Sequence, residues 1–154
     1  MEIEPLEIAD MGMLEQLVDE FVSSHMMLSF RPDYHAAFRD WVNRLTRDPD
    51  ATIFIARDKS EIVGMAIGII LEHGPLISPD KIGYIPMFVI SSKHRRKGAG
   101  RSLWEGLRGW LSSKGVSEVQ LYTQVDSDES RLFWESFGFT VALERRRKWI
   151  GGSA

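Results

Sequence analysis

The chain has 154 residues, which is the size of one typical domain, and we expect residues 1–154 to form a single domain. A content of 44% hydrophobic and 27% charged residues is ordinary for a globular protein and argues against disorder. The formal net charge of −3 argues against a globally basic nucleic-acid-binding protein, and the absence of cysteine excludes thiol nucleophiles, Cys-ligated zinc, iron–sulfur clusters and disulfides.

The N-terminal sequence predicts a strand followed by two helices. Residues 3–8 suggest a short strand, and Asp10 offers an N-cap for a helix whose apolar stripe runs from Leu14 to Val22. A second amphipathic helix follows from Tyr34 to Leu45, and Asp48-Pro49 stops it. The opening residues carry acidic and no basic side chains, which is the wrong charge for a secretory signal. We therefore expect a cytoplasmic protein.

The middle of the chain predicts three strands. Residues 51–58 and 61–73 form an expected hairpin, and residues 82–90 form the next strand. Pro86 lies inside this third strand and indicates an edge or a bulge, because proline cannot donate a ladder hydrogen bond. The longest apolar stretch, residues 62–71, is far shorter than the ~20 residues of a membrane helix, so we expect no membrane partner.

The C-terminal half alternates helices and strands. A helix with an apolar face from Leu103 to Leu111 precedes a strand over residues 116–123, a helix over 127–137, and one or two final strands over 139–150. The order β-α-α-β-β-β-α-β-α-β predicts an α+β fold with a mixed sheet and helices packed on its faces. The basic run from Arg145 to Lys148 is interpreted as a solvated strand edge.

The loop SSKHRRKGAG separates the third strand from the following helix. A helix start attracts anions, and Gly98 and Gly100 would let a phosphate approach the backbone. Basic side chains add positive potential, namely Lys93, Arg95, Arg96, Lys97 and Arg101. The loop is neither a Walker A loop nor a GxGxxG fingerprint. Two interpretations stay open: a phosphate-binding loop, or a basic surface loop whose glycines ease entry into the helix.

RRKGAG, after a strand ending in FVI, resembles the [Q/R]-x-x-G-x-[G/A] signature of the GNAT N-acetyltransferase superfamily. Downstream, SDESRLFWESFGF resembles that family's second motif, and the resemblance covers nearly the whole chain. It implies a mainly antiparallel mixed sheet with helices on both faces. It also implies an acyltransferase that uses acetyl-CoA as co-substrate, without a metal, to acetylate a primary amine of a small molecule or peptide by direct attack. The family often forms homodimers.

The resemblance also assigns residues to the co-substrate. The backbone of Phe88, Val89 and Ile90 would pair with the pantetheine arm like an extra strand. Amides of the glycine-containing loop would hold the pyrophosphate, namely those of Arg95, Arg96, Lys97, Gly98, Ala99, Gly100 and Arg101. The second-motif helix would flank the thioester with Ser127, Ser130 and Trp134.

Two of these positions depart from the family pattern. Ser127 replaces a common asparagine, and Trp134 replaces the tyrosine that is the candidate general acid for the departing thiolate. An indole cannot supply a proton at useful pH. Either another group is the acid, the thiolate leaves unassisted, or catalysis is lost. The last alternative describes an inactive CoA-binding module used for sensing or interaction.

Acetylation of an amine also needs a base or a water chain, and a donor to the oxyanion. A backbone N–H near Val89 or Ile90 is the candidate donor. Tyr84 occupies the position where family members often carry an acidic base, but a phenol with a pKa near ~10 is a poor base and better suits the lining of an acceptor pocket. Glu72 is the second catalytic candidate, beside His73 and Asp80 in the following loop.

The N-terminal helices carry further acceptor-site candidates. His25 and His35 flank these helices, and Phe30 is the aromatic residue that lies outside the helical stripe. The four histidines show no metal-ligand spacing, so we expect no metal site. Nucleic-acid binding is also disfavoured, because the basic loop lacks interleaved aromatic residues.

Overall fold

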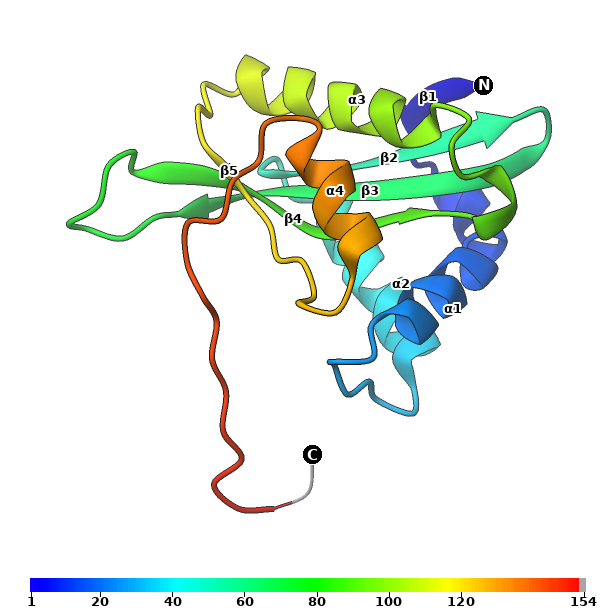
Figure 1. Cartoon of the computed structure of the whole chain (residues 1–154). Helices are drawn as coiled ribbons and strands as arrows, with labels where there is room; N and C mark the ends of the chain where they lie inside the picture. The colour runs from blue at the N-terminus through cyan, green and yellow to red at the C-terminus, as the bar shows by residue number, and fades with distance from the viewer. Residues whose placement is uncertain (153–154) are drawn as a thin grey trace.

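The computed structural model describes residues 1–152 and contains one five-stranded sheet in the order β1-β2-β3-β4-β5 (Figure 1). Its elements are β1 (Glu2–Pro5), η1 (Ile8–Met13), α1 (Glu15–Ser24), α2 (Tyr34–Leu45), β2 (Ala51–Asp58), β3 (Glu61–Glu72), β4 (Lys81–Ile90), η2 (Ser92–His94), α3 (Ala99–Ser113), β5 (Val119–Gln120) and α4 (Asp128–Glu135). Strands β1 to β4 are antiparallel, whereas β5 is parallel to β4. The predicted mixed, mainly antiparallel sheet is confirmed.

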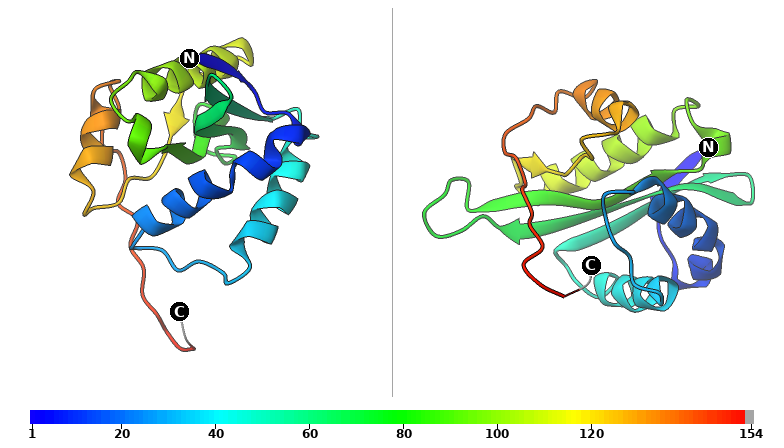
Figure 2. Two further views of the ribbon diagram at one scale, coloured as in Figure 1. Left: turned by 90° about the vertical axis from the view of Figure 1, so that its right-hand side faces the viewer. Right: turned by 60° about the horizontal axis from the view of Figure 1, so that its bottom comes forward.

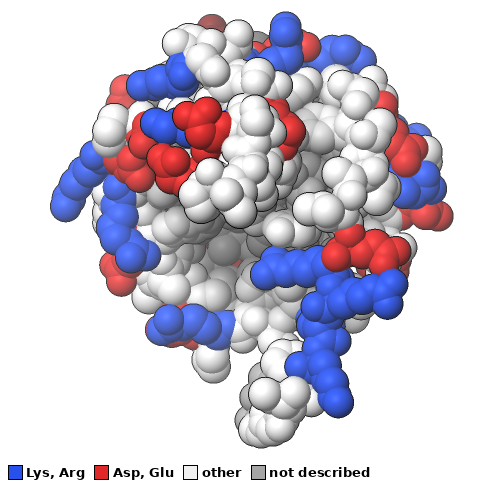
Figure 3. Space-filling model, turned by 90° about the vertical axis from the view of Figure 1, so that its left-hand side faces the viewer, with Lys and Arg blue, Asp and Glu red and all other residues white. Residues whose placement is uncertain are grey.

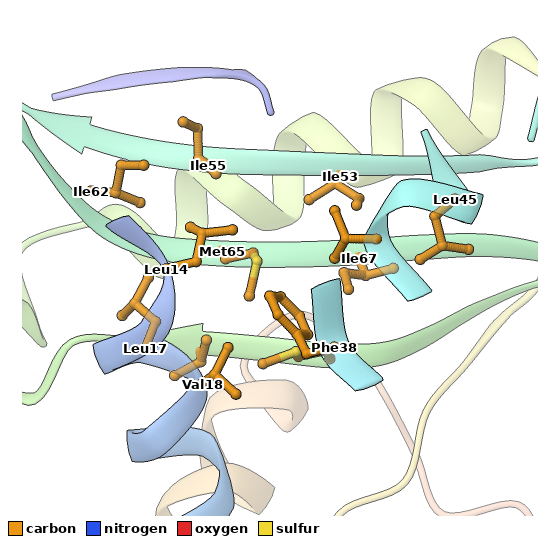
Figure 4. Packing of buried hydrophobic residues seen from close by; sticks show 13 residues of the cluster. Leu14, Leu17, Val18, Phe38, Leu45, Ile53, Ile55, Ile62, Met65 and Ile67 are labelled. Atoms are coloured by element: carbon orange, nitrogen blue, oxygen red, sulfur yellow. The ribbon is translucent and has the colours of Figure 1, made fainter. Parts of the chain in front are cut away.

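Helices cover both faces of this sheet (Figure 2). On one face, α1 and α2 pack against side chains such as Met65 and Ile67 of β3 (Figure 4). On the other face, α3 and α4 pack against Ala66. Successive residues of a strand point to opposite faces, so a strand covered on both sides is apolar throughout. This explains why residues 62–67 are all buried.

Pro86 lies at a bulge in β4. The ladder between β3 and β4 pairs Ile67 with Met87 and next pairs Ile69 with Tyr84. Two residues of β4, Ile85 and Pro86, therefore lie opposite the single residue Gly68. The sequence-based expectation of a bulge is confirmed, and the bulge bends β4 at the point where it meets β5.

The predicted N-cap at Asp10 is wrong. Helix α1 begins at Glu15 without a capping side chain, and Asp10 lies in the preceding 3₁₀ turn. The Asp10 carboxylate instead accepts a hydrogen bond from Arg57 at 2.9 Å, and Glu4 accepts a second one from the same guanidinium. Arg57 lies on β2. A partner distant in sequence therefore binds the carboxylate that the local sequence pattern predicts to cap a helix.

The C-terminal strands also differ from expectation. The strand predicted over residues 116–123 is limited to Val119–Gln120. The one or two strands predicted over residues 139–150 are wrong: this segment is extended but forms no ladder, and it leaves the body of the molecule (Figure 1). A strand requires a backbone partner, and alternating side chains do not supply one.

Candidate active site

The candidate site begins where β4 and β5 separate. The two strands pair at Gly83 and Tyr84, next to the bulge, and β5 ends at Gln120. Within residues 1–152, no strand continues alongside Phe88 to Ile90 on the β5 side of the sheet. The edge of β4 after the bulge therefore has no strand beside it, and we call this gap in the sheet the opening between β4 and β5. An extended ligand backbone could pair with this edge as an added strand.

The glycine-containing loop closes one end of this opening. Arg96 and Gly98 both have positive φ values, 61° and 90°, which turn the chain sharply into α3. Gly98 precedes the helix without a capping side chain, so the first amides of α3 have no intrahelical acceptor. A Cβ atom built on Gly98 would meet no atom within 4 Å. The loop thus presents free space beside uncapped amides at the positive end of the α3 dipole, which suits a phosphate group.

Gly100 is glycine for a different reason. A Cβ atom at this position would lie 2.8 Å from Cε2 of Phe133 on α4. No real side chain tolerates that distance, so Gly100 allows α3 and α4 to pack closely. The sequence-based interpretation of two phosphate-facing glycines fits the open space at Gly98, whereas at Gly100 the space is filled by an aromatic ring.

Ion pairs and amide contacts hold the loop in place. Arg95 Nη1 lies 3.6 Å from Glu129 Oε2 of α4, and Arg101 places its guanidinium 5.1 Å from the centroid of the Phe137 ring. The backbone N–H of Ser92 donates to Glu20 Oε2 of α1 at 2.8 Å. Sequence reasoning missed Glu20, because no local pattern links it to an amide that is far away in the chain.

Trp134 lies in an aromatic cluster that joins α4 to α3 and β4. Its side chain is 6% exposed, and its ring centroid lies 4.8 Å from Phe88, 5.1 Å from Phe139 and 6.0 Å from Trp104. At the start of α4, Ser127 Oγ accepts a hydrogen bond from the Ser130 amide at 3.4 Å. This contact gives Ser127 a helix-capping role. The structure therefore supports a packing role for Trp134, with one edge of the cluster formed by the open strand β4.

Tyr84 lies at the junction of the two strands and faces Tyr122, with 6.0 Å between ring centroids. Burial raises the pKa of the Tyr84 phenol; the nearby Tyr122 raises it further, while Arg145 opposes the increase. The phenol therefore holds its proton at neutral pH and is available to donate a hydrogen bond to a ligand. Glu72 is exposed at the far end of β3, about three residues or ~10 Å along the strand from the partner of Tyr84. The structure does not bring the two catalytic candidates together.

We expect Tyr84→Phe to leave the pH dependence of kcat/KM unchanged from neutral pH to about pH 9, because the phenol stays protonated throughout that range. The loss in kcat/KM should be about tenfold or less, the cost of one hydrogen bond. Tyr122→Phe, which removes a neighbouring hydroxyl, is the matched control. If the kcat/KM of the unmodified enzyme rises at alkaline pH and this rise is lost in Tyr84→Phe but not in Tyr122→Phe, Tyr84 would instead be the base.

A glutamine connects the segment after α1 to the segment after β5. Gln124 Nε2 donates to the carbonyl of Ser24 at 2.8 Å, and Gln124 Oε1 accepts from the amide of Met27 at 2.9 Å. The intervening His25 stacks on Phe21 at 3.9 Å between centroids. Sequence reasoning missed Gln124, since a single polar residue after a strand carries no motif. This link ties the loop before α2 to the segment after β5.

The other N-terminal candidates contact residues of α1. His35 Nε2 lies 2.7 Å from Asp19 Oδ1, which also accepts from the hydroxyl of Tyr34. Phe30 is partly exposed and lies edge-on to Phe21. In residues 1–152 no group of three or more metal-ligating side chains is arranged to hold an ion. No helix of that range is long and apolar enough to cross a membrane.

The site thus combines a mixed sheet that opens between β4 and β5 with an uncapped helix start. In a comparison with known families, residues 13–139 match the Acetyltransferase (GNAT) family. The match spans most of the chain, and the chain therefore belongs to the GNAT acetyltransferase family. The predictions of an acetyltransferase enzyme and of the family are confirmed.

Individual relatives are distant in sequence. N-alpha-acetyltransferase 30 of Schizosaccharomyces pombe is 25% identical over 100 residues, which cover 65% of this chain and 65% of that protein. Among solved structures, an aminoglycoside antibiotic 6'-N-acetyltransferase from Acinetobacter haemolyticus superposes with a TM-score of 0.80 at 16% identity, over 99% of this chain and all of its own. A predicted acetyltransferase from Clostridium acetobutylicum, solved with acetyl-CoA, gives 0.81 at 14% identity, over 97% and 96% of the two chains. The structural likenesses show the fold.

Proposed function

We propose that this chain transfers the acetyl group of acetyl-CoA to a primary amine of a small molecule or peptide. The observation that carries the proposal is the opening between β4 and β5, which starts at the Pro86 bulge and ends at the uncapped start of α3. An acyl-CoA has an extended amide-containing arm and a pyrophosphate. Both suit this geometry, the arm beside an open strand edge and the pyrophosphate beside free amides.

The residues divide between these two parts of the ligand. In this proposal the backbone of Phe88, Val89 and Ile90 pairs with the pantetheine arm. The loop from Arg95 to Arg101 holds the pyrophosphate, with the open space at Gly98 nearest to it. Ser127 and Ser130 begin the helix that flanks the thioester, and Trp134 packs behind Phe88.

The reaction is direct attack of the neutral amine on the thioester carbonyl carbon. The C–N bond forms, the C–S bond breaks, the amine loses a proton, and the CoA thiolate gains one. An amide near Val89 or Ile90 would donate to the oxygen that becomes negative. Tyr84 is protonated and cannot accept the proton of the amine, so we assign this step to a water chain or another base. A thiolate is a good leaving group and needs less help from an acid than an amine would.

The proposal also concerns the class of molecule that accepts the acetyl group. The names of two similar proteins, an N-alpha-acetyltransferase and an aminoglycoside 6'-N-acetyltransferase, both describe acetyl transfer to nitrogen. The side chains that would line the acceptor site, among them Tyr84 and Tyr122, come from elements that meet only in the folded chain. We therefore propose that the acceptor is an amine, and the panel of amines described below tests which class of molecule carries it.

Two measurements test the proposal. We expect acetyl-CoA and CoA to raise the melting temperature more than ATP does, because a ligand that binds only the native state stabilises it by about 2.7 kcal/mol at a hundred times its Kd. We also expect steady release of CoA thiol with at least one amine from a panel of polyamines, aminoglycosides, amino acids and peptides. No shift with either CoA species rejects the co-substrate. A shift without turnover on any amine would favour the inactive binding module, for which the comparisons give no support.

A further inference from the structure

The proposed position of acetyl-CoA directs its thioester toward the junction of β4 and β5. With the pyrophosphate at the start of α3, which follows Ile90 in the chain, a ligand extended along β4 runs back toward the bulge at Pro86. The acetyl group then lies next to the point where Tyr84 pairs with Gln120. The side chains around this junction therefore select the amine that attacks.

Tyr84 lies on the face of the sheet that α1 and α2 cover. A Cβ atom built on Gly83 would lie 2.8 Å from Cδ2 of Leu111, so Gly83 points toward α3. Neighbouring residues of a strand point to opposite faces, which directs Tyr84 toward α1 and α2. Tyr84 and Tyr122, whose rings meet edge to face, thus form a wall of the junction on that face.

Two arginines of the extended segment 140–150 reach the same face. The guanidinium of Arg145 lies 4.8 Å from the centroid of the Tyr122 ring, and Arg147 donates to the carbonyl of Met27 in the loop after α1. Side chains two residues apart in an extended segment point to the same side. The two guanidinium groups therefore lie beside the junction, one on each of the segments that flank it.

The charge of Arg145 is not neutralised by a carboxylate. Within residues 1–152 it forms no ion pair. Two acidic side chains of the flanking segments bind elsewhere, because Glu144 pairs with Arg146 at 2.6 Å and Glu118 accepts a hydrogen bond from Gln120 at 2.7 Å. Figure 3 shows basic side chains gathered on the projecting end of the chain, beside a hollow in this face of the molecule. The junction is therefore positively charged on the side of the arginines.

We propose that the acceptor is an acidic amine, a primary amine whose molecule carries a carboxylate that Arg145 and Arg147 bind. The inference rests on the proposed function and names the substrate class of the same site. A guanidinium group presents parallel N–H donors that match the two oxygens of a carboxylate. Polyamines and aminoglycosides carry several positive charges, and the arginines would repel them.

The same two arginines also favour the form of the amine that reacts. An amine must be neutral to attack the thioester, and a nearby cation lowers the pKa of an amine because it disfavours the ammonium form. Two guanidinium groups beside one carboxylate leave a net positive charge at the junction. The arginines thus bind the acceptor and raise the fraction of it that carries a free lone pair.

The first test compares acceptors that differ in one carboxylate. The pairs are β-alanine with β-alaninamide, and aspartyl-glycinamide with asparaginyl-glycinamide. We expect kcat/KM to be about tenfold or more higher for the acidic member of a pair and to fall as salt is added. A preference in the first pair alone identifies a small amino acid, and one in the second alone identifies a peptide. Equal or faster turnover of the amides or of spermidine would overturn the inference and leave the acetyltransferase function intact.

The second test removes one charge at a time. Arg145→Gln should lower kcat/KM for the acidic acceptor by about tenfold, with the value for the matched amide and the KM for acetyl-CoA nearly unchanged. Arg146→Gln is the matched control, because it removes the same charge from a side chain that pairs with Glu144 and should keep the preference. Thermal melts report whether both variants fold. An equal loss for acidic and neutral acceptors, or equal losses in the two variants, would contradict the inference.

Binding of the acetylated products gives a readout that needs no turnover. In the presence of CoA, isothermal titration with N-acetyl-β-alanine and N-acetyl-aspartyl-glycinamide should show binding of at least one of them. Arg145→Gln should weaken this binding by about tenfold, whereas Arg146→Gln should not. If CoA itself does not bind, the proposed function fails at its co-substrate. If CoA binds and the acidic products bind no better than the acetylated amides, the acceptor class alone is wrong.

Discussion

Gly98→Glu is expected to weaken acetyl-CoA binding by about a hundredfold or more, equivalent to ~2.7 kcal/mol. Gly98 faces free space at the uncapped start of α3, and a carboxylate there would occupy the proposed position of the pyrophosphate and repel it. Isothermal titration with acetyl-CoA measures the effect. Wild-type affinity in this variant would place the pyrophosphate elsewhere.

Two further variants separate charge from backbone strain. Gly98 has a φ of 90°, so any side chain there is strained. Gly98→Ala introduces this strain without the carboxylate and should weaken binding far less than Gly98→Glu. Gly115 has a comparable φ of 77° and nothing within 4 Å of a built Cβ, but lies beyond the opposite end of α3. Gly115→Glu should therefore match the strain and charge of Gly98→Glu and retain acetyl-CoA binding.

Gly100→Glu is a poorer test of the same site. A side chain at Gly100 collides with the ring of Phe133, so we expect this variant to separate α4 from α3 and to lower stability. The sequence alone suggests that both glycine variants keep the fold, because it shows the motif but not the ring that fills the space.

Trp134→Ala is expected to lower the free energy of unfolding by about 3–5 kcal/mol. The indole is nearly fully buried and contacts rings from β4, α3 and the segment after α4, so its removal leaves a large cavity. Urea unfolding at one protein concentration measures the loss. Leu132→Ala on the same helix is the control, because that side chain is 56% exposed and should cost less than about 0.5 kcal/mol.

The conservative variant Trp134→Tyr separates packing from acid catalysis. A tyrosine keeps much of the ring contact and adds a group that can give a proton. If Trp134 packs, kcat should change by less than about tenfold across the pH range, once an acceptor is known. A tenfold or greater rise in kcat would show that the missing proton donor limits the natural enzyme.

Local sequence patterns determined most of the secondary structure and the location of the glycine-containing loop before α3. Period-3.6 stripes give α1, α2 and α3 close to their observed bounds, and the hairpin of β2 and β3 follows from two β-rich runs around a polar turn. The strand–RRKGAG–helix unit indicates a phosphate site because helix starts attract anions wherever they occur. Pro86 indicates a bulge because the missing N–H is a property of the residue itself.

Contacts between residues distant in sequence determined the other features of the fold and of the candidate site. Asp10 pairs with Arg57, Glu20 with the Ser92 amide, and Gln124 with the segment after α1, and each partner is remote in sequence. The unequal roles of Gly98 and Gly100 depend on the ring of Phe133, and the burial of Trp134 depends on four elements meeting. The alternating residues 139–150 satisfy the pattern of a strand but lack a strand beside them. A side-chain pattern is a property of the sequence itself, whereas the backbone partner that a strand needs is supplied only by the tertiary structure.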